Sequence, residues 1–393
     1  MSEAPSGEWA LRGCIGSVTA AELLQVQERV VIDLRSPGEH EEDQIPGSVN
    51  LPLFGDEERA LVGLLYKSQS PDAAFLRGIE LVRPRLVRLV EEICSLAREP
   101  LPAGDPLSVF EALTRQGMAA LEGQLELQRV PALPHKPLVI HCWRGGLRSR
   151  SVVALLNSLG ITRAVVLEGG YRAWRSVLVE RIERWEPPPI FVLRGLTGVG
   201  KSLVLRAIEA ERPGWTLDLE ALAGHRSSML GAIGLQPVSQ KRFESRLAQR
   251  LEQLRGPCVV MEGESRKVGD RIIPVHIFAA LESGSAIELH APLEKRLRIL
   301  REDYLATPAH LPALAEAIRR LEPRLNLPEE ERDLAAKLLA GAIDQVTEIL
   351  LQRHYDPLYR HAERGKKYQL RIDSSDPRAA GREVLRWIES ALR

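Results

Sequence analysis

Residues 138–149, with the sequence LVIHCWRGGLRS, carry the signal that decides the fold of the first half of the chain. The apolar run 138–140 predicts a short buried strand, and a helix is expected over 149–159. A loop between a strand and a helix that carries two glycines and two arginines directs several backbone amides at one point. We therefore predict an anion-binding loop with Cys142 as its nucleophile, in which the anion is held by Arg144, Gly145, Gly146 and Arg148.

Cys142 has an alternative, purely structural interpretation as a buried, inert cysteine before a tight turn. Packing alone explains neither the paired glycines nor the arginines on either side of them. The functional interpretation is therefore favoured, and the loop amides, the helix N-terminus and Arg148 are expected to stabilise a thiolate.

The composition indicates a globular protein of two or three domains, because the chain has 393 residues and 44% of them are hydrophobic. No run of about 18 apolar residues is present, and the N-terminus lacks the features of a signal peptide, so we expect a cytoplasmic protein with no membrane partner. The four cysteines (Cys14, Cys94, Cys142 and Cys258) lack the spacing of a disulfide framework or of a structural metal site.

Strands that alternate with helices predict an α/β fold with a parallel sheet in each half of the chain. Residues 56–134 have helical periodicity and are expected to form an insertion in the first domain. Three consecutive prolines at 187–189 predict a domain boundary. The expected domains are residues 1–186 and residues 187–393.

A second anion-binding loop follows directly after this boundary. Residues 195–202, GLTGVGKS, match the phosphate-binding pattern G-x-x-x-x-G-K-[ST] between an expected strand and an expected helix. The motif predicts a phosphate site but does not by itself establish nucleotide hydrolysis. Its predicted phosphate-binding residues are Gly195, Thr197, Gly198, Gly200, Lys201 and Ser202.

Carboxylates end two later strands and are candidates to orient a magnesium ion held by Ser202. Glu262 ends the apolar run in CVVMEGE (258–264), and Asp218 lies in a similar position in LDLE (217–220). Glu262 is preferred because its strand is the more apolar. Either residue could instead be a solvated strand end or a helix cap, and no tightly bound cofactor is expected.

Net charge is zero, from 53 basic and 53 acidic side chains, so nucleic-acid binding must be judged locally. One helical stretch carries basic residues at four-residue spacing, and the alternative is a solvated face balanced by neighbouring glutamates. The candidates for nucleic-acid contact are Lys241, Arg242, Arg246 and Arg250. Tyr355 and Tyr359 could stack on a base, although such a pair more often packs in a core.

The first domain resembles a rhodanese. The matching segments are the cysteine loop together with DLRSPGE (33–39), IPGSVNLP (45–52) and LEGGYRAW (167–174). Five residues separate Cys142 from Arg148, one more than in simple sulfurtransferases of this fold, so the loop is wider. That length also resembles cysteine phosphatases, but a phosphatase needs a general acid that the sequence does not identify, and the second loop would remain unexplained.

The combination of a Cys-Trp-Arg-Gly-Gly loop with a P-loop domain resembles the tRNA 2-selenouridine synthases along essentially the whole chain. Further matching stretches are YK (66–67), LDLEALAGHR (217–226), QKRFE (240–244), EGESRKVG (262–269) and YDPLY (355–359). Small departures occur at Ser227, Leu230 and Val238 and concern local packing.

The resemblance implies a transferase that replaces sulfur by selenium at C2 of the wobble 2-thiouridine of tRNA, with selenophosphate as donor. It also implies an S-geranylated intermediate made from geranyl diphosphate, and selenophosphate synthetase is a candidate partner. Two other classes stay open at this point. They are a rhodanese-fold cysteine phosphatase and a nucleotide-switched binding module that would need Lys201 but not Cys142.

Overall fold

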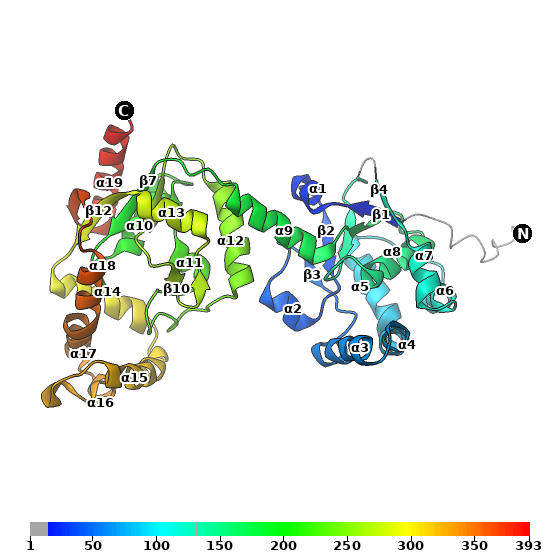
Figure 1. Cartoon of the computed structure of the whole chain (residues 1–393), viewed down its shortest axis with the longest axis horizontal. Helices are drawn as coiled ribbons and strands as arrows, with labels where there is room; N and C mark the ends of the chain where they lie inside the picture. The colour runs from blue at the N-terminus through cyan, green and yellow to red at the C-terminus, as the bar shows by residue number, and fades with distance from the viewer. Residues whose placement is uncertain (1–14, 131–132) are drawn as a thin grey trace, which may run out of the picture. The chain divides into compact units, whose positions relative to one another are not determined.

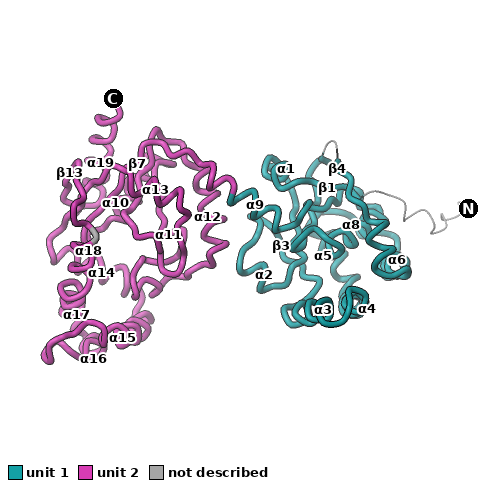
Figure 2. Tube along the Cα trace, viewed as in Figure 1, with its two compact units in different colours: residues 1–179 teal, residues 180–393 magenta. Residues whose placement is uncertain are grey.

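A computed structural model describes residues 15–130 and 133–393, so Cys14 lies outside the described residues. The chain divides into two compact units, unit 1 over residues 1–179 and unit 2 over residues 180–393 (Figure 2). The division falls within helix α9 (Gly170–Glu183), a few residues before the proline run that predicts a boundary at 187. Each unit is built around its own parallel sheet (Figure 1).

The sheet of unit 1 has six parallel strands in the order β3-β2-β5-β6-β1-β4. The strands are β1 (Ile15–Val18), β2 (Val30–Asp33), β3 (Val49–Asn50), β4 (Leu127–Arg129), β5 (Leu138–His141) and β6 (Ala164–Leu167). β5 pairs with β2 on one side and β6 on the other, and all four of its residues are buried. The cysteine loop therefore leaves the carboxyl end of a central strand, where open α/β sheets place their sites.

Helices connect the strands of unit 1. They are α1 (Ala20–Gln25), α2 (Pro37–Glu42), α8 (Leu147–Ser158) and α9, and the insertion adds α3 (Asp56–Ser68), α4 (Pro71–Val82), α5 (Leu86–Ala97), α6 (Pro106–Thr114) and α7 (Met118–Gln124). The insertion differs from the expected all-helical segment at its end, because β4 pairs with β1 as an edge strand. Three residues are too few to show a periodicity of their own.

The sheet of unit 2 has five parallel strands in the order β13-β12-β7-β9-β8. They are β7 (Ile190–Arg194), β8 (Thr216–Leu217), β9 (Val259–Glu262), β12 (Ser285–His290) and β13 (Tyr368–Asp373), and a short hairpin joins β10 (Lys267–Val268) to β11 (Arg271–Ile272). The helices of this sheet are α10 (Lys201–Glu211), α11 (Leu219–Ala223), α12 (Gln240–Gln253), α13 (Val275–Ser283) and α19 (Pro377–Ala391). The predicted parallel α/β architecture of both halves is confirmed.

The remaining helices of unit 2 form a lobe beside this sheet, drawn in yellow to brown in Figure 1. The lobe consists of α14 (Leu293–Leu305), α15 (His310–Leu321), α16 (Leu334–Leu339), α17 (Ile343–Leu350), a π-helical turn (Leu351–Tyr355) and α18 (Asp356–Ala362). It has an apolar core of its own, centred on Ile318, Leu321 and Leu334. The lobe is thus a second packing unit beside the sheet.

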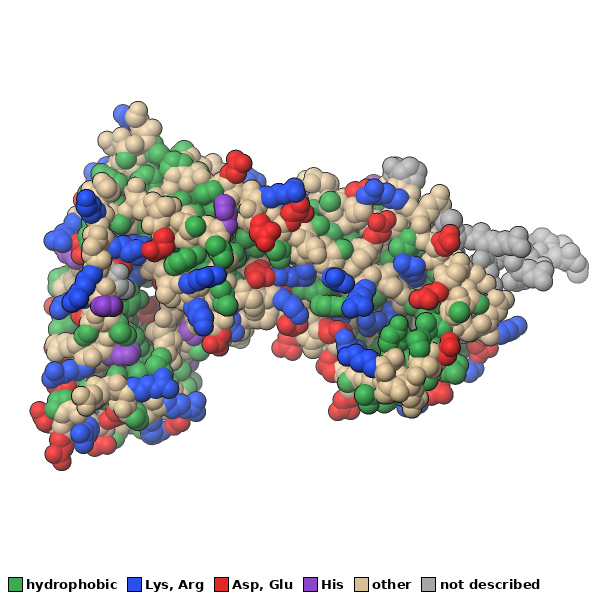
Figure 3. Space-filling view, in the orientation of Figure 1, with side chains coloured by type: hydrophobic (Ala, Val, Ile, Leu, Met, Phe, Trp, Pro, Cys, Tyr) green, Lys and Arg blue, Asp and Glu red, His purple; other side chains and the backbone are tan. Residues whose placement is uncertain are grey.

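Charges of both signs are interspersed over the face shown in Figure 3, in keeping with the zero net charge of the chain. Within the described part of the chain, no helix has both the length and the apolar character needed to cross a membrane.

The hydrophobic core around the sheet of unit 2 can be tested at its central strand, β7. Leu193 on β7 is completely buried, so Leu193→Ala is expected to lower the free energy of unfolding by about 2–5 kcal/mol. Val275, 66% exposed on α13, is the control, and Val275→Ala should change it by less than about 0.5 kcal/mol. Urea denaturation of both variants measures the difference, and equal losses would contradict the assigned core.

Candidate active sites

The cysteine loop of unit 1 is compact and closely packed. Cys142 is 2% exposed, and its Sγ lies 3.3 Å from Oγ of Ser149, which donates to the carbonyl of Gly146. Gly145 has φ +63°, and a Cβ there would lie 2.6 Å from the carbonyl oxygen of Leu167. The loop is therefore restricted to glycine at this position for two reasons, its left-handed backbone and the close approach of the β6 end.

The two predicted arginines of this loop remain available to a ligand. Arg144 is exposed and Arg148 is half-buried in the first turn of α8. Neither side chain has a hydrogen bond or an ion pair to any residue that the structure describes. Guanidinium groups near a loop of backbone amides and a helix N-terminus suit a phosphate-like anion. The anion-binding role of Arg144, Gly145, Gly146 and Arg148 stays a prediction.

The loop is held in place from behind by the start of α9. The amide of Tyr171 donates to the carbonyl of Cys142 at 2.9 Å, and the Trp143 ring packs on the Tyr171 ring with 5.6 Å between centroids. The Tyr171 hydroxyl donates to Asp43, and the Arg35 guanidinium stacks 3.7 Å from the centre of the same ring. Through its contact with Tyr171, Arg35 thus links residues 33–39 to the cysteine loop.

A buried charge network lies beneath this loop. Arg35 and Asp33 form a fully buried ion pair, with Nη2 2.6 Å from Oδ2, and His40 Nδ1 lies 2.9 Å from the same carboxylate oxygen. Burial raises the pKa of Asp33, but hydrogen bonds from His40 and Arg35 and the nearby His141 outweigh it and leave the pKa below its usual range. Asp33 therefore stays ionised in the core.

His141 lies immediately before Cys142 and is completely buried. Neither ring nitrogen has a hydrogen-bond partner among the described residues, and Nδ1 is 3.7 Å from Asp33 Oδ1. Burial lowers the pKa of His141 to about 4, so the ring is neutral at physiological pH.

The P-loop of unit 2 runs from the end of β7 to the start of α10. Gly198 and Gly200 have positive φ angles, +80° and +84°, and Lys201 and Ser202 begin the helix. Lys201 Nζ donates to the carbonyl of Gly195 at 3.2 Å and lies 5.1 Å from the centre of the Tyr359 ring. Thr197 Oγ1 is buried and has no partner among the described residues. The six predicted P-loop residues therefore share one loop, and their phosphate-binding role stays a prediction.

Three carboxylates converge next to Ser202. Oxygen atoms of Glu220, Glu262 and Glu264 lie within 4.8 Å of one another, and the Ser202 hydroxyl donates to Glu262 at 3.0 Å. Glu262 Oε1 is buried without a partner among the described residues. An oxygen-only donor set with an unsatisfied carboxylate oxygen fits Mg²⁺. Asp218, the other predicted acid, lies at the same pocket but caps α11 by accepting from the Ala221 amide at 2.8 Å.

Crowding of these acids changes their proton affinity. Burial raises the pKa of Glu220 to about 8, and the neighbouring Glu264 contributes to the rise. Burial also raises the pKa of Glu262 well above its usual range, with the charges of Asp218, Glu220 and Glu264 acting in the same direction. For Lys201, burial lowers the pKa, but the neighbouring Tyr359 hydroxyl and then the surrounding carboxylates outweigh burial and raise it. The cluster therefore favours a bound cation or extra protons over three ionised carboxylates.

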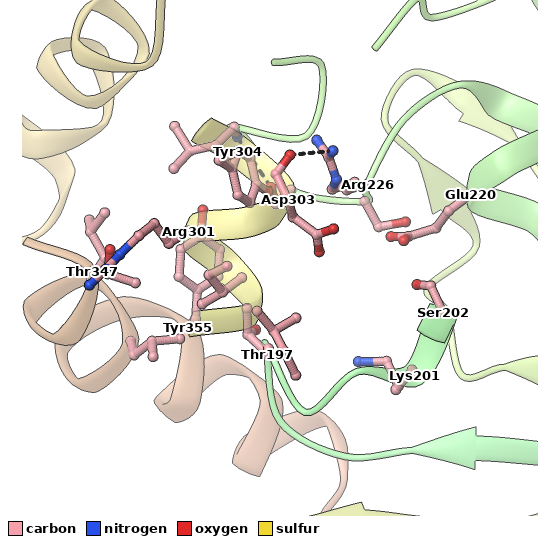
Figure 4. A pocket seen from close by; sticks show the side chains of 18 of the residues that line it. Thr197, Lys201, Ser202, Glu220, Arg226, Arg301, Asp303, Tyr304, Thr347 and Tyr355 are labelled. Atoms are coloured by element: carbon pink, nitrogen blue, oxygen red, sulfur yellow. Dashed lines mark hydrogen bonds between the residues drawn. The ribbon is translucent and has the colours of Figure 1, made fainter. Parts of the chain in front are cut away.

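A pocket of about 750 Å³ extends from the P-loop into the helical lobe (Figure 4). Its polar end holds Lys201, Ser202 and the carboxylates, and Figure 4 shows Asp303 and Arg226 beside them. Its other end is lined by apolar side chains of the lobe, among them Leu314, Ile318, Leu338, Ile343, Val346 and Leu350. The pocket is therefore shaped for a ligand with a charged head and an apolar tail.

A buried ion pair connects the lobe to the P-loop. Arg296 on α14 donates to Asp356 through Nη2 at 2.5 Å and Nη1 at 3.0 Å, and its Nε donates to the carbonyl of Thr197 at 2.8 Å. Arg296 and Asp356 are 6% and 7% exposed. The YDPLY segment (355–359) is thus fixed to the phosphate-binding loop.

The basic stretch forms α12, with Phe243 and Leu247 buried on its inner side. Arg250 donates to the carbonyl of Thr216 at 2.7 Å and pairs with Glu209, and Arg246 donates to the carbonyl of Leu222. These two arginines therefore have structural partners within unit 2, which their four-residue spacing did not indicate. Contact of Lys241, Arg242, Arg246 and Arg250 with tRNA stays a prediction.

Comparison with known proteins identifies the chain. The model of the tRNA 2-selenouridine synthase AAA domain matches residues 188–392, and the model of the rhodanese-like domain matches residues 109–177. The tRNA 2-selenouridine synthase of Nitrosomonas europaea is 32% identical over 340 residues, which cover 83% of this chain and 78% of that protein. The chain belongs to the tRNA 2-selenouridine synthases.

Other members of the family align over similar lengths. The tRNA 2-selenouridine synthase of Chromohalobacter salexigens is 30% identical over 85% of this chain and 88% of its own length, and that of Nitrosomonas eutropha is 32% identical over 79% and 71%. The predicted enzyme class, a tRNA-modifying transferase, and the pairing of a rhodanese domain with a P-loop domain are confirmed.

Solved structures give weaker matches to this tRNA 2-selenouridine synthase. TT1252 from Thermus thermophilus is 17% identical, covers 53% of this chain and 100% of its own chain, and has a TM-score of 0.27. A shikimate kinase from Acinetobacter baumannii in complex with shikimate is 18% identical over 54% of this chain and 98% of its own, with a TM-score of 0.25. At these scores, the fold assignment rests on the strand order and the family models.

His141 should make the stability of the synthase depend on pH. Its pKa in the folded state, about 4, is below the usual 6.5, so the unfolded chain binds more protons between these pH values. The free energy of unfolding should therefore fall as pH drops from about 6.5 to 4, by at most about 3 kcal/mol from this group. Urea denaturation across this range measures the slope. His141→Leu should flatten it, and identical slopes in the two proteins would contradict the assigned burial.

Proposed function

We propose that this protein replaces the C2 sulfur of wobble 2-thiouridine in tRNA by selenium in two steps, with geranyl diphosphate and selenophosphate as the small substrates. In the first step the sulfur is S-geranylated, and in the second selenium takes its place. The observation that carries the proposal is the pocket of unit 2, in which one cavity joins a phosphate-binding loop to an apolar wall.

The head of geranyl diphosphate fits the polar end of this pocket. Lys201 and the backbone amides of the P-loop would bind the diphosphate, and Lys201 would exchange its bond to the Gly195 carbonyl for the phosphate oxygens. Mg²⁺, held by Ser202 and Glu262 with Glu220 and Glu264 beside them, would supply positive charge to the diphosphate as it leaves. Inorganic diphosphate is the leaving group of this step.

The ten-carbon tail fits the apolar end of the pocket. Partly buried side chains such as Leu305 and Ile343 would cover it and exclude water from the reacting carbon. A volume of about 750 Å³ lies in the range of pockets that enclose small organic ligands. A simple nucleotide switch would have no use for this apolar end.

The cysteine loop of unit 1 is suited to the second substrate. Arg144, Arg148 and the amides of Gly145 and Gly146 would bind selenophosphate, an anion of the size of phosphate. Selenium bonds to C2 of the base, the C2–S bond breaks, geranylthiol leaves, and water takes the phosphoryl group. We assign Cys142 a part in this step, in the delivery of selenium or in the release of geranylthiol.

The remaining partners follow from this reaction. tRNA with 2-thiouridine at the wobble position is the macromolecular substrate, and α12 is the candidate to contact its phosphates. A selenophosphate synthetase is the class of enzyme that must supply the selenium donor. The phosphatase and binding-module alternatives each account for one of the two loops but not for both.

Mass spectrometry of nucleosides tests the two steps directly. Purified protein is incubated with 2-thiouridine-containing tRNA, geranyl diphosphate and selenophosphate, added separately and together. We expect a geranylated base with geranyl diphosphate alone and a selenated base with both substrates. Lys201→Ala should lower geranylation by at least about 100-fold, because it removes a charge-assisted contact to the leaving group. An unchanged base with the wild-type protein would refute the proposed function.

Cys142→Ser separates the steps. The change should abolish selenation but leave geranylation and tRNA affinity almost unchanged, because Cys142 belongs to the other loop. Fluorescence anisotropy with labelled tRNA serves as the control for binding. A Cys142→Ser protein that selenates at the wild-type rate would exclude this residue from the chemistry.

A further inference from the structure

We propose that Tyr359 is a catalytic residue for geranyl transfer, whose aromatic face stabilises the allylic cation that forms as diphosphate departs. This inference rests on the proposed function of the unit 2 pocket. It concerns a side chain of the lobe, outside the P-loop and outside the carboxylate cluster.

The position of the ring supports this role. Tyr359 lines the pocket from α18, and its centre is 5.1 Å from Lys201 Nζ, within the range of a cation–π contact. The ring face is therefore directed at the place where a positive charge already lies. When a diphosphate binds, the Lys201 ammonium is drawn toward the phosphate oxygens, and the carbon attached to the diphosphate is brought close to this face.

The ring is also held in place. Asp356 begins the helix that carries Tyr359, and its buried pair with Arg296 is fixed to the P-loop through the Thr197 carbonyl. A π-helical turn (Leu351–Tyr355) directly precedes α18, and such turns are frequent at functional sites. The distance between Tyr359 and the P-loop is thus set by charged contacts.

The other two tyrosines of this pocket are directed elsewhere. Tyr304 has the Arg226 guanidinium 4.7 Å from its ring centre, and hydrogen bonds to the carbonyls of Ile233 and Asp303 hold that guanidinium there, so the face stays occupied when a ligand binds. The Tyr355 ring lies edge-on to His354, with 4.9 Å between centroids. Of the three rings, Tyr359 is the one that faces Lys201.

The chemistry of an allylic diphosphate calls for such a group. As the C1–O bond of geranyl diphosphate breaks, its electron pair leaves with the diphosphate, and positive charge spreads over C1 and C3 of the geranyl group. A lone pair of the thiouridine sulfur then forms the C1–S bond, and the N3 proton of the base is released to water. No oxidant or reductant is needed. An aromatic face stabilises this charge without forming a bond to the cation.

Graded fluorination of the ring tests the role, because each fluorine weakens the negative potential of the aromatic face at nearly constant shape. Tyr359 is replaced by phenylalanine, by difluorophenylalanine and by trifluorophenylalanine, and also by leucine. Single-turnover geranylation of 2-thiouridine tRNA gives the rate, and calorimetry gives the affinity for inorganic pyrophosphate. Tyr66, exposed on α3 in unit 1, receives the same replacements as the control.

We expect Tyr359→Phe to keep most of the rate. The rate should then fall stepwise with fluorination, to about one-tenth or less in Tyr359→Leu. Pyrophosphate affinity should change by less than the rate, and the Tyr66 series should show no trend. If the series loses pyrophosphate affinity in the same proportion as rate, Tyr359 only positions Lys201, and the inference is wrong. A geranylation rate that does not change along the fluorinated series also overturns the inference. A wild-type protein that transfers no geranyl group instead overturns the proposed function itself.

Discussion

The buried ion pair between Arg296 and Asp356 is the contact on which the architecture of unit 2 depends. Arg296 belongs to α14, Asp356 begins α18, and the same guanidinium binds the carbonyl of Thr197 in the P-loop. One side chain thus joins the wall of the apolar pocket, the aromatic segment and the phosphate-binding loop. Loss of either partner would leave a buried charge uncompensated, at a cost of about 3–5 kcal/mol.

Both units share one local arrangement that suits an anion. In each, a buried parallel strand ends in a glycine-containing loop, and a helix begins where the loop ends. The amides and the helix N-terminus provide a positive region for an anion in both cases. The units differ in the side chains next to this positive region. Unit 1 has a cysteine there, and unit 2 has a lysine with three carboxylates.

Much of this could be predicted from the sequence, because both loops are local motifs. Strands β5 and β7, the two loops and Glu262 were accessible from apolar runs, glycine spacing and a carboxylate at a strand end. The lobe was not. Its apolar residues, such as Ile318 and Val346, have the same helical spacing whether they fill a core or line a pocket.

Long-range pairings were equally hidden. Nothing in the sequence connects Arg296 to Asp356, or Arg35 to Tyr171, because each contact depends on how distant elements pack. Tyr359 illustrates the same limit, since a tyrosine at helical spacing could stack on a base or fill a core, and only the folded chain brings it to Lys201. Asp218 was the predicted acid of residues 217–220 and Glu220 was not, whereas the fold makes Asp218 a cap and brings Glu220 to Glu262.

The close packing of the cysteine loop has a consequence for how this site can change over evolution. A side chain at Gly170 would collide with the carbonyl of Cys142, and one at Gly145 would collide with the end of β6. The Arg144 side chain, in contrast, is exposed and has no hydrogen bond or ion pair to the described residues that its replacement would break. The loop can therefore accept a new charge pattern but not a new shape. Divergence at this site would therefore change the charge that the loop presents before it changed the backbone that carries it.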